Sequence, residues 1–470
     1  MKKSRDDLYS PERRTALVLS GVGTAGAYHA GVLRALHEAG VKLDIVAGRG
    51  VGAVGAVFAA VDGAQRLWDD KGFWRASAIS GLYSWRPLVR LAALAVAASV
   101  LLVLLPLAVM AAGLIVFPID FLLKMVGVAT GGGLVSRYLN LAEMLFAPTA
   151  LPTWLPRLVL LVLGLAAMIA AASAWSGPSR SEARRTRGRF WWRLLRAPMT
   201  TKGAVEHCCS ALWDLVRGAA QLKQPNNIEL GRRYTELLSE NLGQPGFREL
   251  LIVAHDVDAH GDLVFALVAE ARRRDLLRRP TTTEAEARQA GIVDLSGVGR
   301  EHLTDAVAAA LTVPLAAEFH SITFAAESYW RGETHRLCDR PASLLRLVEE
   351  LMHLDVAQMI LVSAAPDQPG PHQLDRAQLE GRGRIGDYLQ SAEAAAVSDV
   401  TSFGGEGRPR IFTIQPTHNP IGPFDFSGGF DDRSDRRQSL AELMNRGYED
   451  AYRQFIEPVV GASGERVGTV

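Results

Sequence analysis

The chain has 470 residues, enough for one large domain or two to three ordinary ones. Its 51 lysines and arginines almost balance 50 aspartates and glutamates, and the net charge of +1 excludes nucleic acid as a partner of the whole molecule. Its three cysteines form neither a disulfide framework nor a metal-ligand spacing: Cys208, Cys209 and Cys338. The sequence contains no motif for a metal or another cofactor, and we expect none.

A stretch rich in glycine, residues 16–60, organises the rest of the chain. The apolar run Ala16–Leu19 predicts a buried parallel strand, and a glycine loop and the helix Ala27–Ala39 follow it. A second strand, Leu43–Ala47, turns through another set of glycines into a second helix. The loop glycines are Gly21, Gly23 and Gly26, and the turn glycines are Gly48, Gly50 and Gly52. The loop leaves its backbone N–H groups at a helix N-terminus, which favours an anion or an oxyanion.

Two interpretations compete for this stretch. The loop fits the G-x-G-x-x-G pattern of dinucleotide-binding proteins, with Asp44 near the position of the ribose-binding acid. That acid should follow the second strand, at the carboxyl end that faces the ligand. Asp44 begins its strand instead, so a dinucleotide-binding protein is the third alternative.

Residues 20–53 resemble the opening of the patatin-like phospholipases, a family with a glycine-rich oxyanion loop, a G-V-L-x-x-L-x-x-x-G helix and a G-x-S-x-G elbow. The resemblance resumes after residue 200. It implies an α/β fold, with a mainly parallel sheet flanked by helices, and a membrane lipid as the partner. In this family the elbow presents a nucleophilic serine, an aspartate takes its proton, and the loop stabilises the oxyanion.

The chemical positions of the family are altered here. Gly50 stands at the nucleophile position, and an alignment on glycines puts Arg331 near the position of the dyad aspartate. Asp339 is the nearest alternative, but no glycine follows it. Val22 replaces a loop glycine and narrows the approach to the oxyanion donors. Because glycine cannot attack an ester and arginine accepts no proton, we predict a pseudohydrolase that binds a lipid or a protein partner.

The main alternative is an active lipid acyl hydrolase with an unidentified nucleophile. Ser20 adjoins the glycine loop, but serine beside such a loop is usually a turn former. A second cluster, His255 to His260, resembles a metal site in composition, yet it falls between two predicted strands of a hairpin. We therefore interpret that cluster as a solvated turn.

Two uncharged apolar runs, Leu91–Phe117 and Leu158–Trp175, predict an inserted transmembrane hairpin. Basic residues precede the first run, and an arginine-rich segment, Arg180–Arg196, follows the second. By the positive-inside rule both flanks are cytoplasmic. The N-terminus has no apolar segment of a cleaved signal peptide. These features predict a multi-pass protein of the inner (cytoplasmic) membrane whose globular domain is cytoplasmic.

The predicted organisation has three parts. Residues 15–85 form the first half of a patatin-like domain, with the glycine loop and the elbow. Residues 86–198 form the membrane hairpin and a basic linker, and residues 199–457 form the second half of the domain. The role of residues 367–407 is not predicted.

Overall fold

A computed structural model describes residues 9–127, 133–147, 151–175, 197–277, 290–366, 381–402, 408–431 and 433–460. The chain separates into two compact units. The first combines Met1–Ser84 with Met199–Val470, and the second is Trp85–Pro198. The predicted arginine-rich segment, 180–196, lies outside the described residues.

The first unit is built on a nine-stranded sheet in the described part of the chain. Its main path is β11-β10-β1-β2-β5-β6-β7, with β8 and β9 attached beside β5. The strands are β1 (Thr15–Gly21), β2 (Ile45–Gly50), β5 (Glu249–Asp256), β6 (Gly261–Leu267), β7 (Ile292–Asp294), β8 (His320–Thr323), β9 (Thr334–Cys338), β10 (Gln358–Ser363) and β11 (Arg410–Ile414). The five strands from β11 to β5 are parallel, and β6 is antiparallel to β5. The predicted α/β fold with a mainly parallel sheet is therefore confirmed.

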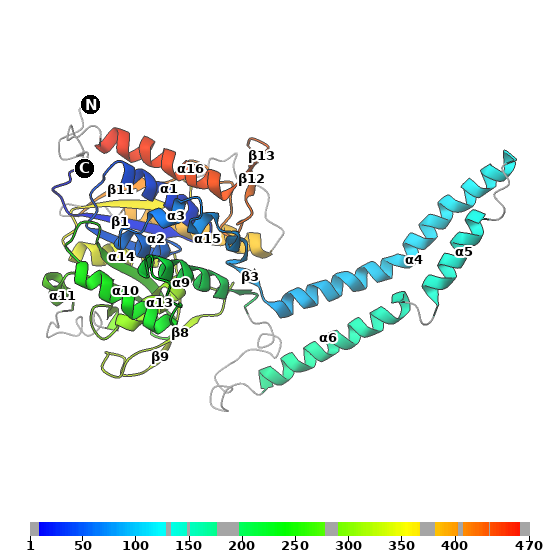
Figure 1. Ribbon diagram of the computed structural model, residues 1–470, viewed down its shortest axis with the longest axis horizontal. Coiled ribbons are helices and arrows are strands. Elements are labelled where there is room, and N and C mark those ends of the chain that lie inside the picture. The colour runs from blue at the N-terminus through cyan, green and yellow to red at the C-terminus, as the bar shows by residue number, and fades with distance from the viewer. Residues whose placement is uncertain are drawn as a thin grey trace. The chain divides into compact units, whose positions relative to one another are not determined.

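Helices cover both faces of this sheet (Figure 1). Alternate residues of β1 face opposite layers, as the strand period requires. Val18 packs in a core with Leu347 of α14 and Val397 of α15, whereas Leu19 contacts the backbone of α2 and lies near Leu33 of α1. The helices of this unit are α1 (Ala25–Glu38), α2 (Gly52–Ala60), α3 (Gln65–Trp68), α9 (Lys202–Val216), α10 (Asn227–Asn241), α11 (Glu270–Leu277), α13 (Leu303–Leu311), α14 (Ser343–His353), α15 (Gly381–Ser402) and α16 (Leu440–Ala451).

Shorter elements complete the unit. They are the 3-10 turns Phe73–Arg75, Ser77–Gly81 and Arg300–His302, the π-helical segment Tyr452–Val460, and the strand pairs β3 (Ser84–Trp85) with β4 (Met199–Thr200) and β12 (Gly429–Asp431) with β13 (Arg436–Gln438). Ser439 caps α16 through a capping box with Glu442, which fixes where this helix begins.

The strand register brings the two glycine turns together. Gly21 at the end of β1 is the partner of Gly50 at the end of β2. Both turns therefore lie at the carboxyl edge of the parallel strands, where α/β sheets bind ligands. Asp44 precedes β2 and accepts a hydrogen bond from the N–H of Thr15, at the start of β1. This carboxylate lies at the opposite edge from the loop, so the structure does not support the dinucleotide alternative.

The predicted hairpin is formed by β5 and β6, but its turn is not simply solvated. Asp256 is buried, and its carboxylate accepts hydrogen bonds from the N–H groups of Asp258 and Ala259 and contacts His335 at 2.5 Å. The expectation of a solvated turn is therefore wrong for Asp256, because its side chain is needed to satisfy the backbone of the turn. No group of metal-ligating side chains is present among the described residues.

The second unit consists of α4 (Pro87–Met125), α5 (Gly133–Phe146) and α6 (Leu151–Trp175). Tyr138 of α5 packs against α4, where its hydroxyl donates a hydrogen bond of 2.8 Å to the carbonyl of Val109. In the described part of the chain one helical segment, Leu107–Met125, is long and apolar enough to cross a membrane. Val89–Leu101 and Pro156–Ile169 are apolar but shorter. This segment overlaps the first predicted run, Leu91–Phe117, and no described segment of full length matches the second, Leu158–Trp175.

Candidate functional site

Gly50 has the backbone conformation of a nucleophile elbow. It ends β2 with φ of 58°, in the left-handed region, and α2 begins two residues later. Glycine adopts this conformation without the steric penalty that a Cβ atom brings. The strand, the sharp turn and the helix predicted around Gly48, Gly50 and Gly52 are therefore all present, without a side chain at the central position.

The glycine loop occupies the space that a nucleophile would need. A Cβ atom added to Gly50 would lie 2.1 Å from the carbonyl oxygen of Gly21. The same oxygen accepts a hydrogen bond of 2.9 Å from the N–H of Val51. In an elbow of this kind, the N–H of the residue after the nucleophile is an oxyanion donor. Here that N–H is satisfied by the loop itself.

Three further N–H groups of the loop, and the hydroxyl of Thr24, are also engaged. The N–H of Thr24 donates to the carbonyl of Pro423 at 3.0 Å, and the hydroxyl of Thr24 donates to the carbonyl of Gly422. The N–H groups of Ala25 and Gly26 donate to Val22 and Gly23 within the loop. The segment around Pro423 therefore closes the loop from the outside.

The carboxylate beside Gly50 belongs to Asp339. The Oδ2 atom of Asp339 lies 3.2 Å from the Cβ position that Gly50 lacks. The backbone N–H of Asp339 donates a hydrogen bond to the carbonyl of Thr312. Arg331 lies in the exposed turn between β8 and β9, with φ of 47°. The expectation that Arg331 occupies the dyad position is wrong. The alignment on glycines placed that position before β9, whereas the chain reaches the elbow only after β9, at Asp339.

A buried arginine holds this aspartate. Nη1 of Arg49 donates to both carboxylate oxygens of Asp339 at 2.8 Å. Nη2 of Arg49 pairs with Glu393 of α15, and Nε donates to the hydroxyl of Ser20 at 3.0 Å. That hydroxyl in turn donates to Glu393 at 2.5 Å. All four side chains are at least 95% buried, so the residues form a closed internal network.

The charge of the network is unbalanced. Burial raises the pKa of Asp339 to about 6, Arg49 opposes that rise, and Glu393 adds to it. One guanidinium faces two carboxylates, so the second negative charge is disfavoured in this dry surrounding. Burial disfavours the charged form of Arg49, but the two carboxylates outweigh that effect and the pKa of Arg49 is raised. Arg49 therefore stays positive, and it occupies both carboxylate oxygens of Asp339.

His29 lies behind the loop and does not supply a base. Its Nε2 is 3.1 Å from the carbonyl oxygen of Ser20, an arrangement in which this nitrogen carries the proton. Burial lowers the pKa of His29 to about 4, so the ring is neutral at pH 7.

Little space remains at this edge of the sheet. A cavity of about 30 Å³ lies between the glycine loop and α15, lined by Val22, Leu389, Glu393 and Ile421 among others. This volume suits about two water molecules, whereas sites for organic ligands usually enclose roughly 300–1,000 Å³. Val22 thus forms part of the wall, as its replacement of a loop glycine predicts.

Sequence reasoning missed the two residues that define the site. No role was predicted for Arg49, although a charge at the end of the apolar strand Ile45–Gly50 signals a buried ion pair. Glu393 falls in the segment for which no role was predicted. No local pattern in α15 indicates its target, because the contact joins residues 344 positions apart.

A family model described as Patatin-like phospholipase matches residues 17–112. Over 68 residues the chain is 44% identical to proteins named Patatin-like phospholipase domain-containing protein 6 from Homo sapiens and Mus musculus. The aligned part is 14% of this chain and 5% of each relative, so the chain spans a small fraction of their length. The matched region holds the glycine loop, the elbow and part of α4, and it is similar to lipid hydrolases.

Among solved structures, the crystal structure of VipD from Legionella pneumophila aligns with 96% of this chain and 67% of its own. The TM-score is 0.32 and the sequence identity 14%.

Proposed function

We propose that this protein is a membrane-anchored, patatin-like pseudohydrolase that binds a lipid or a protein partner and does not cleave acyl esters. The observation that carries the proposal is the buried pairing of Arg49 with Asp339 next to Gly50. A dyad needs a hydroxyl on the elbow and a carboxylate free to take its proton. Here the elbow has no hydroxyl, and both oxygens of the carboxylate accept hydrogen bonds from a permanent cation.

The loop geometry supports the same conclusion. The N–H of Val51 is bonded to Gly21, and the cavity beside the loop is too small for an acyl chain. A nucleophile at position 50 would therefore need the loop to move before either it or a substrate could be accommodated. Loss of the nucleophile alone costs about 10⁶-fold in serine hydrolases.

The second unit supports the membrane part of the proposal. Leu107–Met125 has a mean hydropathy of 2.0 and only 11% of the segment is buried. Large side chains such as Leu114 and Ile115 are more than 60% exposed. An apolar surface of this extent is typical of contact with lipid. A hairpin with cytoplasmic flanks, in a multi-pass protein of the inner membrane, remains our proposal for its topology.

One observation favours an active hydrolase instead. Ser20 donates its hydroxyl hydrogen bond to the carboxylate of Glu393, a pairing that resembles a nucleophile with its base. Ser20 is fully buried in β1, however, and the guanidinium of Arg49 contacts both groups. We therefore rank this candidate second, with Ser20 as its testable nucleophile.

The test is turnover by the purified full-length protein in detergent. Phospholipid and short-chain esters are assayed together with a fluorophosphonate probe that labels reactive serines. We expect neither turnover nor labelling above the level of the heat-denatured protein. Turnover that persists through repeated purification would overturn the proposal, and its loss in Ser20→Ala would establish the second candidate.

Topology is tested separately in sealed cells with a membrane-impermeant thiol reagent. The native cysteines are buried, so a single cysteine at Val126, which is 78% exposed at the end of α4, reports its own location. We expect Val126→Cys to react from the outer side and Ser80→Cys, in the first unit, to react only after lysis. Labelling of both from the same side would exclude a crossing by α4.

A further inference from the structure

A second cavity lies at the amino edge of the sheet, away from the elbow. It measures about 520 Å³ and is formed where the chain enters β1, β2 and β5. The charged residues that line it are Arg14, Lys42, Asp44, Arg248, Glu249 and Arg272. The seven residues of β1 separate this edge from the glycine loop by roughly 20 Å at 3.3 Å per residue. The two sites are therefore independent.

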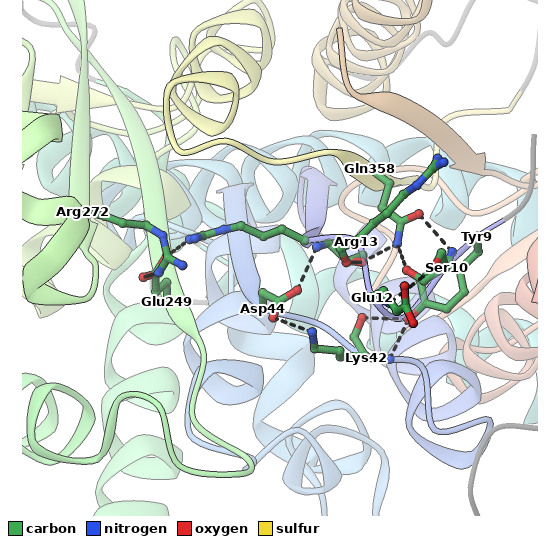
Figure 2. Close-up of polar contacts among 11 residues, drawn as sticks. Tyr9, Ser10, Glu12, Arg13, Lys42, Asp44, Glu249, Arg272 and Gln358 are labelled. Atoms are coloured by element: carbon green, nitrogen blue, oxygen red, sulfur yellow. Dashed lines mark hydrogen bonds and ion pairs between the residues drawn. The ribbon is translucent and has the colours of Figure 1, made fainter. Parts of the chain in front are cut away.

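The two acidic side chains of the cavity are already satisfied by the protein. Glu249 is buried and contacts Arg14, Arg272 and the N–H of Ala269, the last two at 2.8 and 3.0 Å. Asp44 accepts the N–H of Thr15 at 2.9 Å and lies 3.4 Å from Nζ of Lys42. Figure 2 shows Lys42 next to Asp44, and Arg272 next to Glu249.

The cations of the cavity retain donors after these contacts. Arg272 uses Nη1 for Glu249, and Arg248 uses Nη1 for the carbonyls of Ala59 and Gly246. The contacts of the described residues leave Nε and Nη2 of both guanidiniums without a protein acceptor, and they leave Nε of Arg14 buried and unpaired. Four cations of the lining face two carboxylates, and Asp62, outside the lining, lies 3.6 Å from Nη1 of Arg248, so the lining is positive overall.

The walls of the cavity are held in place. The hydroxyl of Tyr9 accepts the N–H of Lys42 at 2.9 Å and donates to its carbonyl at 3.1 Å, which fixes the backbone before β2. Gln358 bonds both Ser10 and Thr15 and so fixes the chain before β1. A site whose cations are positioned before the ligand arrives loses less entropy on binding.

From this geometry we infer that the cavity binds an organic phosphate, a phosphate monoester on a hydroxyl-bearing group. An anion matches the positive lining, and the arginine forks suit tetrahedral phosphate oxygens. The volume lies within the range of sites for organic ligands and exceeds the need of a bare ion. Asp44, which is partly exposed, is placed to accept a hydroxyl of the same molecule.

The test uses the full-length protein in detergent and glycerol 3-phosphate as the probe, followed by calorimetry. We expect saturable binding of glycerol 3-phosphate, no binding of glycerol, and at least a tenfold loss of affinity in the double variant Lys42→Gln/Arg272→Gln. Both side chains are about half exposed, so this variant should fold normally. Arg232→Gln is the matched control, since Arg232 is 51% exposed and pairs with Glu229 on α10.

Vesicles distinguish a free phosphate from a lipid headgroup. If phosphatidic acid vesicles compete with glycerol 3-phosphate and phosphatidylcholine vesicles do not, the ligand is a headgroup, and if neither competes, it is a free metabolite. Both results support the site. Equal affinity in the native protein and the double variant, or no binding at millimolar concentration, would overturn it.

Discussion

The two edges of the central sheet use charge in opposite ways. At the carboxyl edge, Arg49 is fully buried and each of its nitrogens contacts a protein acceptor. At the amino edge, Lys42 and Arg272 are half exposed and retain donors beside a cavity of about 520 Å³. The edge where open α/β sheets usually bind ligands is closed, while the opposite edge carries an open cavity.

The comparison shows that a charged residue in a site can have a structural role or a ligand-binding role. A charge whose partners are all internal holds the structure together, and removing it leaves buried groups unpaired. A charge with donors left over is available to a ligand and contributes little to folding. Substitutions at the two edges should therefore differ in kind, and the following four tests are ordered by the size of the expected effect.

Replacing Arg49 with methionine should have the largest effect. Asp339 and Glu393 would remain buried without their cation, so we expect a loss of about 3–5 kcal/mol in the free energy of unfolding, measured with urea. The triple variant Arg49→Met/Asp339→Asn/Glu393→Gln should recover part of this loss because no buried charge remains. A loss below about 1 kcal/mol in Arg49→Met would show that the network is not structural.

The free energy of unfolding should change with pH as Asp339 titrates. Its pKa of about 6 in the folded protein exceeds the usual value of 3.8, so the folded state binds the proton more tightly. The stabilisation is therefore complete below about pH 4 and is lost as the pH rises through about 6, by on the order of 3 kcal/mol. Urea titrations from pH 4 to about 7 should show this slope in the native protein and not in Asp339→Asn.

Restoring a serine at position 50 should destabilise the protein without restoring activity. The left-handed backbone and the contact at 2.1 Å with Gly21 predict a loss of about 2–3 kcal/mol. Gly81→Ser is the matched control, because Gly81 has open space around it and no left-handed backbone. Esterase activity in Gly50→Ser would contradict the view that the loop and Arg49 block the site.

Arg272→Gln should have the smallest effect on stability. Glu249 keeps Arg14 and the N–H of Ala269, and Arg272 is 43% exposed, so we expect a loss of at most about 1 kcal/mol in urea unfolding. A loss as large as that of Arg49→Met would remove the contrast between the two edges.

Local patterns in the sequence predicted much of the fold. The apolar runs around Val18 and Val46 predicted two strands of a parallel sheet, and the structure confirms them as the neighbours β1 and β2. Turn glycines predicted where these strands end, because glycine alone adopts φ of 58° at Gly50 without strain. The predicted membrane hairpin stays a prediction, since the described residues hold one segment of full length, Leu107–Met125, and only the shorter helix Pro156–Ile169 in the second run.

The site was predicted only in part. Gly50 could be placed because its neighbours along the chain define the turn. The position of Asp339 beside Gly50 could not be predicted. It depends on the pairing of β9 with β5, which joins distant parts of the chain and which no local pattern encodes. Arg49 and Glu393 were missed for the same reason, as a buried ion pair is recognised only when both partners are brought together.

The hydrogen bond from Val51 to the carbonyl of Gly21 means that position 50 and the glycine loop cannot change independently. A side chain added at position 50 would meet that carbonyl before it could meet any ligand. Opening this edge of the sheet would therefore require the loop, the residue at position 50 and the buried partners of Arg49 to change together.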